Sequence, residues 1–337
     1  MKLRQLDAVR GAAAFYVFFH HARPLSLPLV SNIQFFGQEA VAIFFLMSGF
    51  VIQYSVASWD VINFRRYFMH RFRRIYPMLL ISLFLAWIAN RLAGGHVSGH
   101  WSLLASLLMY HDISSLKPGV MFDPWMGNDP LWSLSYEWWF YCLYPLVVTL
   151  VSPKFRKYIV ASVGVLCGIA YHCHPNQISL YLSYFPLWWA GVELASEYFE
   201  TRNVTFSGQC VSLLSIFMLF MLHICVTVYY YISGKGFSLG VYPFLLARHA
   251  GFVLFSIMIA IFWKKSGWRW FDTLLGPWAY LSSISFGIYV FHRPVLIALR
   301  SFGLNAWDTF LVAIPIVFIL AYIAECVVQP KINRLLK

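Results

Sequence analysis

Charged residues are scarce in this sequence, and acidic residues are the scarcest. Of 337 residues, 11% are charged, with 13 Asp and Glu against 25 Lys and Arg, whereas soluble domains carry about 25% charged residues. A water-soluble globule does not fit this composition. The contents of 60% hydrophobic and 19% aromatic residues indicate an integral membrane protein with aromatic belts at the interfaces. The net charge of +12 does not indicate a nucleic-acid partner, because the basic residues alternate between segments as in membrane proteins.

Other features are absent as well. No polar stretch is long enough for a separate soluble domain, and there is no internal repeat. The N-terminal stretch lacks the pattern of a cleaved signal, so we expect a single transmembrane domain over residues 1–337. The six cysteines lie mostly inside apolar runs, which favours core packing over disulfides. His96, His100 and His111 do not have the spacing of a metal site, and we expect no metal.

Long apolar runs predict an all-α bundle of about ten transmembrane helices. The predicted spans are residues 8–27, 34–56, 75–95, 130–151, 157–174, 178–199, 207–231, 243–263, 277–300 and 308–329. For segment 96–129 we expect an external loop with an interfacial or re-entrant helix. With a cytoplasmic N-terminus, eighteen Lys and Arg fall on the inner side and seven on the outer side. The positive-inside rule therefore places both termini in the cytoplasm.

The first predicted span contains Arg10 and His21. Ionisable groups at membrane depth cost roughly 2.5 kcal/mol or more, so they are candidates for a functional site. Eleven residues make about three helical turns, so both side chains share one face, roughly 16 Å apart along the axis. The predicted topology puts His21, Glu137 and His292 at a similar level in the outer half of the membrane. The rival interpretation is that these groups form only structural hydrogen bonds or ion pairs.

Arginines are concentrated where the third predicted span begins. The run 64–77 contains five of them, and guanidinium groups near free helical N–H groups suit phosphate. The candidates for binding a polyanion are Arg71, Arg73 and Arg74. A coenzyme A thioester has a matching shape, since phosphates and a reactive group lie at opposite ends of a long arm. The rival roles are topology signals or contacts to anionic lipid headgroups for these arginines, and an interfacial anchor for Arg10.

Five sequence motifs occur in the order typical of one family. They are Leu6–Gly11 followed by His21, Phe44–Phe50, Arg71–Pro77, Leu131–Trp138 and Ser285–Pro294. On these motifs the chain resembles the membrane-bound acyltransferase-3 family, the bacterial multispan O-acyltransferases that modify polysaccharides and other glycans. The resemblance runs over nearly the whole chain.

The resemblance implies an O-acyltransferase of the bacterial inner (plasma) membrane. Its donor would be acetyl-CoA or another short acyl-CoA on the cytoplasmic side, and its acceptor a hydroxyl of a glycan or lipid-linked sugar. His21 would be the catalytic base, Arg10 a cation that orients CoA or supports the structure, and Glu137 a support of the active site. The three arginines of the third span would bind the CoA phosphates.

Several alternatives stay open at this stage. Many family members have an acidic residue where this chain has Ala42, so either Glu39, the nearest carboxylate, takes that role or the role is absent. His292 either joins the site or forms a capping hydrogen bond before Pro294. His21 acts either as a base or as a transiently acylated nucleophile. The acceptor, the acyl chain and the oligomeric state stay open as well.

A protein of another class could carry the same residues. Intramembrane Arg, His and Glu also mark permeation pathways, so the alternative function is a transporter or flippase for an acyl donor or lipid-linked sugar, without chemistry. A transporter would more often have paired repeats with broken helices, and this sequence has none. A transporter would also not break a thioester, so it would not release free CoA.

Overall fold

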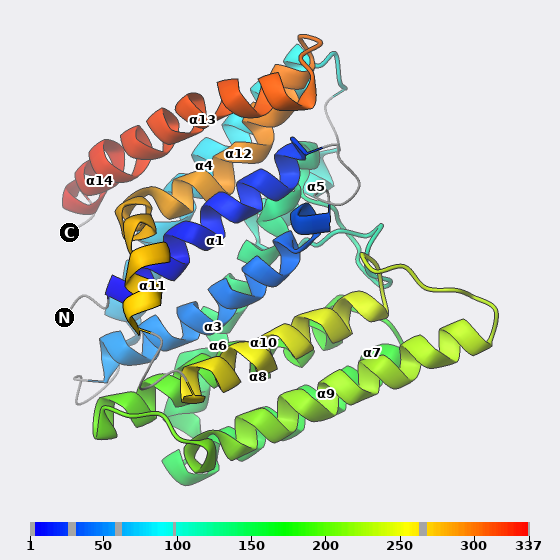
Figure 1. Cartoon of the computed structure of the whole chain (residues 1–337), viewed down its shortest axis with the longest axis vertical. Coiled ribbons are helices and arrows are strands. Elements are labelled where there is room, and N and C mark those ends of the chain that lie inside the picture. Colours follow the sequence, from blue (N-terminus) through cyan, green and yellow to red (C-terminus); the bar gives the residue numbers. More distant parts are fainter. Residues whose placement is uncertain (1–3, 26–31, 58–62, 97–98, 263–267, 336–337) are drawn as a thin grey trace.

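The computed structural model describes residues 4–25, 32–57, 63–96, 99–262 and 268–335, and every regular element in these ranges is a helix (Figure 1). The longer helices are α1 (Arg4–Ala22), α3 (Gly37–Val56), α4 (Phe64–Leu92), α6 (Trp132–Leu150), α7 (Pro153–Cys173), α8 (Gln177–Thr201), α9 (Phe206–Ile232), α10 (Phe244–Phe262), α12 (Ser285–Arg300) and α13 (Ala306–Tyr322). The shorter ones are η1 (Asn32–Phe35), α5 (His100–Leu107), η2 (Trp125–Gly127), η3 (Asp129–Leu131), α11 (Trp268–Leu274), η4 (Gly276–Ile284), the π-helical segment η5 (Ile323–Val328) and α14 (Gln329–Leu335).

The prediction of an all-α membrane protein is confirmed for the described residues. Six helical segments among them are long and apolar enough to cross a membrane: Gly37–Val56, Phe64–Leu92, Phe206–Ile232, Phe244–Phe262, Gly276–Arg300 and Ala306–Leu335. The other four predicted spans overlap with α1, α6, α7 and α8, so the number ten stays a prediction. Helix α1 begins and α14 ends at the same end of the bundle (Figure 1), but the side of the membrane stays a prediction too. Four residues in the charge count lie outside the described residues: Lys2, Lys264, Lys265 and Lys337.

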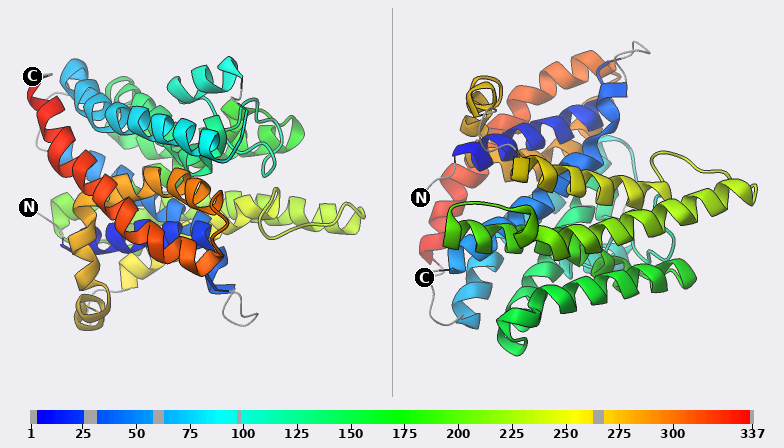
Figure 2. Two further views of the ribbon diagram at one scale, coloured as in Figure 1. Left: turned by 90° about the horizontal axis from the view of Figure 1, so that it is seen from above. Right: turned by 60° about the horizontal axis from the view of Figure 1, so that its bottom comes forward.

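Helices α1 and α3 lie inside the bundle. Helix α1 packs against η4, α12 and α3, and α3 packs in turn against α8 and α10. Helices α12 and α13 therefore lie on one side of this pair, and α8 and α9 lie on the other (Figures 1 and 2). This arrangement gives α1, which carries Arg10 and His21, protein neighbours for its polar side chains.

Two glycines let α3 and α8 approach closely. A Cβ atom on Gly49 would lie 2.1 Å from the carbonyl oxygen of Trp188, and one on Gly191 would lie 2.0 Å from that of Leu46. Small residues at helix crossings permit such backbone contacts in membranes. The motif Phe44–Phe50 therefore has a structural reason for its glycine.

A buried ion pair anchors the segment between α5 and α6. Lys117 Nζ lies 2.9 Å from Asp112 Oδ2, and the two side chains are 1% and 0% exposed. The hydroxyl of Tyr136 donates to the same carboxylate at 2.5 Å, and Lys117 Nζ lies 3.8 Å from the ring centroid of Trp132. Burial lowers the pKa of Lys117, and the Asp112 carboxylate opposes that shift. This part of the predicted loop is thus fixed onto the first turns of α6.

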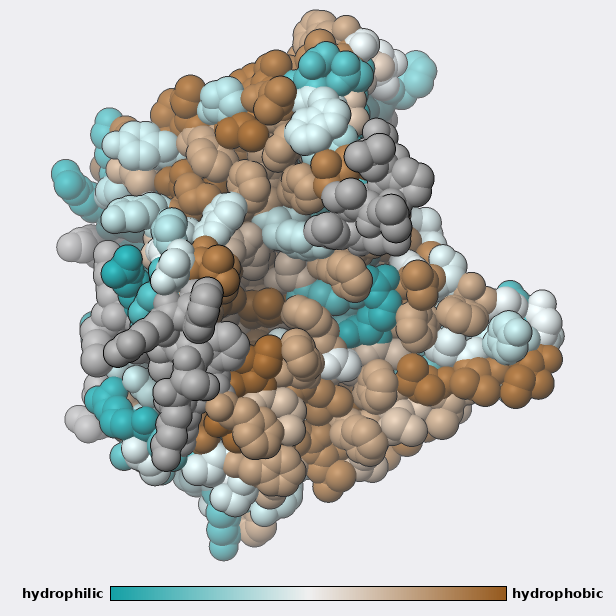
Figure 3. Space-filling view, viewed as in Figure 1, coloured by the Kyte–Doolittle hydropathy of each residue, from teal (hydrophilic) through white to brown (hydrophobic). Residues whose placement is uncertain are grey.

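The outer surface is largely apolar. Figure 3 shows hydrophobic residues along the edge formed by α9 and along α13, where large side chains such as Phe217 and Leu311 are exposed. Such a surface suits lipid contact. The cysteines follow the same pattern, and their expected place in the core is wrong for four of them, because Cys173, Cys210, Cys225 and Cys326 are exposed.

Gly49→Val should destabilise the fold, because its side chain would collide with the backbone of α8 rather than with a movable side chain. Overpacking of this kind costs about 1–3 kcal/mol or more. The measurement is the apparent melting temperature in detergent, which is the temperature at which the monodisperse gel-filtration peak is lost. Gly240→Val is the matched control, since a Cβ there meets no atom within 4 Å. Equal melting temperatures for the two variants would contradict the prediction.

Lys117→Met should also lower the melting temperature, because the Asp112 carboxylate would stay buried without its partner. Breaking a buried pair in this way costs about 3–5 kcal/mol. Lys235→Met is the control, because Lys235 is exposed and lies over the Tyr230 ring. The prediction fails if both lysine variants unfold at the temperature of the wild type.

Candidate active site

A cavity of about 180 Å³ lies where α1, α3, α4, α6 and the start of α12 meet. Its wall combines apolar side chains with a set of polar ones: Arg10, Ser48, Arg71, Arg74, Ser133, Glu137, Tyr141, Ser285 and Tyr289. Three of these side chains are cationic and one is a carboxylate. All five sequence motifs that carry the family resemblance contribute to this wall. Arg10 comes from the first motif, and each of the other four supplies further lining residues.

The structure separates the three arginines of the predicted polyanion site. Arg71 and Arg74 line the cavity, whereas Arg73 does not. Positions three apart share a helix face, while Arg73 points to another one. Arg71 lies over the rings of Tyr67 and Tyr141 at 5.6 Å and 5.7 Å, and Arg74 lies 5.7 Å from the ring of Phe286.

The expected contribution of free helical N–H groups at these arginines is wrong. Helix α4 begins at Phe64, eleven residues before the predicted span, so Arg71 and Arg74 lie about two and three turns inside it. Their backbone N–H groups are therefore engaged in the helix, since only the first four N–H groups of a helix are free. The guanidinium groups alone remain for an anion. Among the described residues, neither side chain makes an ion pair.

Glu137 is held on the cavity wall by two hydroxyl groups. Ser48 of α3 donates to its Oε1 at 2.7 Å, and Tyr141, one turn further along α6, donates to the same oxygen. The Ser48 and Tyr141 oxygens are 2.9 Å apart. These contacts fix the carboxylate in the cavity beside the arginines.

His21 meets His292 instead of Glu137. Nε2 of His292 lies 3.1 Å from Nδ1 of His21, and the ring centroids are 4.9 Å apart. His292 is fully buried on α12, and His21 lies in the last turn of α1. Neither histidine lines the cavity. The three side chains predicted at one level thus form two sites, a histidine pair and a carboxylate among arginines.

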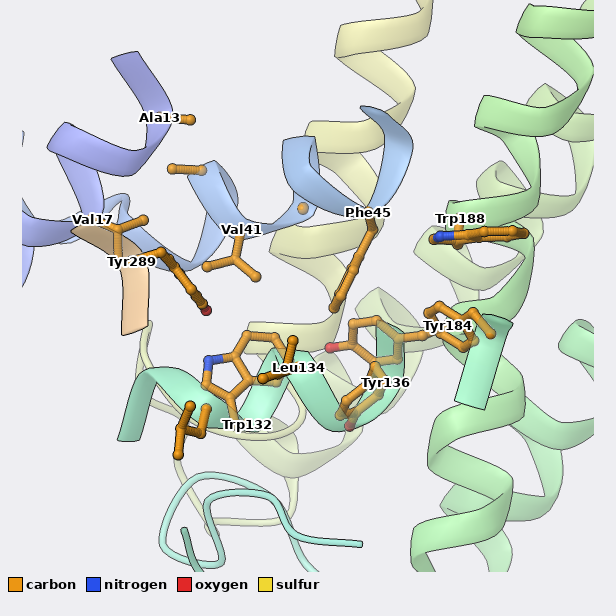
Figure 4. Packing of buried hydrophobic residues seen from close by; sticks show 14 of the residues in the cluster. Ala13, Val17, Val41, Phe45, Trp132, Leu134, Tyr136, Tyr184, Trp188 and Tyr289 are labelled. Carbon is orange, nitrogen blue, oxygen red and sulfur yellow. The ribbon is translucent and has the colours of Figure 1, made fainter. Parts of the chain in front are cut away.

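Tyr289 borders both sites. Its side chain lines the cavity, and its ring centroid lies 6.2 Å from that of His292, one turn further along α12. Its hydroxyl lies 2.6 Å from Ser133 Oγ and donates to the carbonyl oxygen of Pro130 at 2.7 Å. Figure 4 shows Tyr289 directed toward α6, which carries Trp132 and Leu134.

Glu39 lies outside both sites. Its Oε1 is 2.5 Å from Nη2 of Arg248 on α10, and the carboxylate is buried. Arg248 also donates to the carbonyl oxygens of Leu239 and Phe35. Ala42 is buried as well, so neither position supplies a carboxylate to the cavity wall. Glu39 instead ties α3 to α10.

The comparisons with known proteins bear on what this arrangement does. The family model described as an acyltransferase domain (acyltransferase 3) matches residues 3–326. The chain belongs to the acyltransferase-3 family.

Part of the chain is similar to two curated relatives. It is 30% identical over 164 residues to the acyltransferase MdmB of Streptomyces mycarofaciens, a match that covers 45% of the chain and 40% of the relative. It is 29% identical over 164 residues to nodulation protein 10 of Rhizobium leguminosarum bv. viciae, covering 43% and 44%. The chain thus spans less than half the length of the relatives it matches. No solved structure matches.

Several residues of the candidate site were missed by sequence reasoning. Ser48, Ser133 and Tyr289 lie inside the recognised motifs, and Tyr141 follows Glu137 by one helical turn. Glu325 was missed as well, although a lone carboxylate in an apolar run signals a special role. Its Oε1 accepts the backbone N–H of Gly287 at 2.7 Å, which caps the start of α12 beside the cavity.

Proposed function

We propose that this protein is an integral membrane O-acyltransferase that moves a short acyl group, most simply acetyl, from acyl-CoA to a hydroxyl of a cell-envelope or secreted glycan. Membership of the acyltransferase-3 family supports group transfer. The observation that supports acyl-CoA as the donor is the cavity whose wall contains Arg10, Arg71 and Arg74 beside apolar side chains. We further propose that the membrane is the bacterial inner membrane, with the cavity toward the cytoplasm.

Acyl-CoA fits the chemistry of this cavity. Guanidinium forks bind phosphate oxygens in pairs, and Arg71 and Arg74 have no carboxylate partner among the described residues to compete with a phosphate. Drug-sized ligands need pockets of about 300–1,000 Å³, so a cavity of about 180 Å³ would hold only part of the donor. The thioester arm would extend past Tyr289 toward the histidine pair.

In the proposed reaction, His21 is the general base. The acceptor hydroxyl transfers its proton to His21 while its oxygen forms a bond to the thioester carbonyl carbon. The carbon–sulfur bond then breaks, and the sulfur leaves with the proton from the imidazolium as free CoA. Proton transfer by a placed side chain contributes about 10²–10⁴-fold to such a reaction.

His21→Ala should therefore lower transfer by about 10²-fold or more without changing folding or membrane insertion. The assay follows labelled acetyl-CoA with purified protein in nanodiscs, with and without extracted envelope glycan, and measures labelled glycan and free CoA. His172→Ala is the control, because His172 pairs with Tyr242 and His223 on elements that do not line the cavity. Transfer retained in His21→Ala would refute the role of His21 as the base. Binding of acetyl-CoA without release of free CoA by the wild type would favour the alternative function of a transporter.

Arg71→Gln and Arg74→Gln should each raise the KM for acyl-CoA by about 10-fold or more. A hydrogen bond to a charged group contributes about 1.5–3 kcal/mol, and about 1.4 kcal/mol corresponds to a factor of ten. Arg73→Gln provides a control of equal charge on the same helix, whose side chain lies off the cavity wall, and its KM should change much less. Equal effects of all three substitutions would point to surface charge rather than to this cavity.

A further inference from the structure

The hydrogen bonds around the histidine pair determine which ring nitrogens carry protons. Nδ1 of His21 lies 2.9 Å from the carbonyl oxygen of Val17, and Nδ1 of His292 lies 3.0 Å from that of Ile288. Each carbonyl belongs to the residue one turn earlier in the same helix. A carbonyl oxygen only accepts hydrogen bonds, so both Nδ1 atoms must be the N–H donors.

This assignment leaves Nε2 of neutral His292 with a free lone pair. That atom lies 3.1 Å from Nδ1 of His21, so the Nδ1–H of His21 is shared between Val17 and His292. Nε2 of His21 is then unprotonated, and no described residue bonds it. The opposite tautomer would put the Nδ1 lone pair of His21 against the oxygen of Val17 and the Nε2 lone pair of His292, which repel it.

We propose that His292 is a positioning residue that holds His21 in the Nδ1–H tautomer and orients its Nε2 as the proton acceptor of the transfer reaction. This inference rests on the proposed function, in which His21 is the base. When Nε2 of His21 takes the acceptor proton, the Nδ1–H becomes part of an imidazolium. Its hydrogen bond to His292 is then charge-assisted, and such bonds are roughly twice as strong as neutral ones.

A neutral partner suits this location. His292 is 0% exposed, and an unpaired buried carboxylate would carry a large desolvation cost. The nearby carboxylates are engaged elsewhere: Glu137 with Ser48 and Tyr141, and Asp129 with Arg293 at 3.1 Å. A second imidazole therefore orients the base without itself adding a permanent charge.

Two variants separate orientation from packing. His292→Phe keeps a ring in place but removes the acceptor, whereas His292→Gln keeps an acceptor oxygen near the position of Nε2. We expect the phenylalanine variant to lose about 10- to 100-fold in kcat with an unchanged KM for acyl-CoA, because His292 does not line the cavity. The kcat of the glutamine variant should be at least about tenfold higher than that of the phenylalanine variant. Melting temperatures of both variants verify the fold.

A wild-type kcat in His292→Phe, or equal losses in both variants at equal stability, would overturn the proposal. Nitrogen-15 NMR of histidine-labelled protein gives a readout besides activity, with the His21 signal assigned by its loss in His21→Gln. Protonation of His21 at Nδ1 supports the inference, and protonation at Nε2 overturns it. If wild-type protein releases no CoA, the proposed function fails instead, and the tautomer is still measured by NMR.

Discussion

The pairing of polar side chains inside an apolar helix bundle is the constraint on which this structure depends. Water cannot compensate an unpaired group there, and several buried ionisable side chains accordingly have partners on neighbouring helices. His21 meets His292, Glu39 meets Arg248, and Glu325 caps α12. These contacts tie α1, α3, α10, α12 and the π-helical segment together. Arg71 and Arg74 line the cavity and make no ion pair with a described residue, which favours this cavity as the place where an anionic ligand would bind.

The division into a cavity and a histidine pair bears on the proposed acyl transfer. A small anion bound between Arg71 and Arg74 would lie away from His21, because His21 does not line the cavity and Tyr289 borders both sites. A donor with charged groups at one end of a long arm and its reactive carbonyl at the other can bind both. The distance along α1 between Arg10 and His21, roughly 16 Å, therefore suits a coenzyme A thioester better than acetyl phosphate or another compact donor.

Much of this could be predicted from the sequence, and the rest depended on helix packing. Long apolar runs were sufficient for the all-α fold, and an isolated Arg10 or His21 in such a run already signals a site. The separation of Arg73 from Arg71 and Arg74 required the true start of α4, because helical phase decides which face each side chain takes. The pairing of His21 with His292 required the contact of α1 with α12. Predicted depth in the membrane groups Glu137 with the two histidines, because depth contains no information on lateral position.

The two sites also differ in how they carry charge. In the cavity the cations are permanent, and binding of the proposed anionic donor would offset the cost of keeping them partly buried. At the histidine pair both rings can be neutral, and charge appears only when His21 takes up a proton. In the proposed reaction, the apolar surroundings of the fully buried His292 would then favour return of that proton to the leaving sulfur, because a charged imidazole is less stable in an apolar environment.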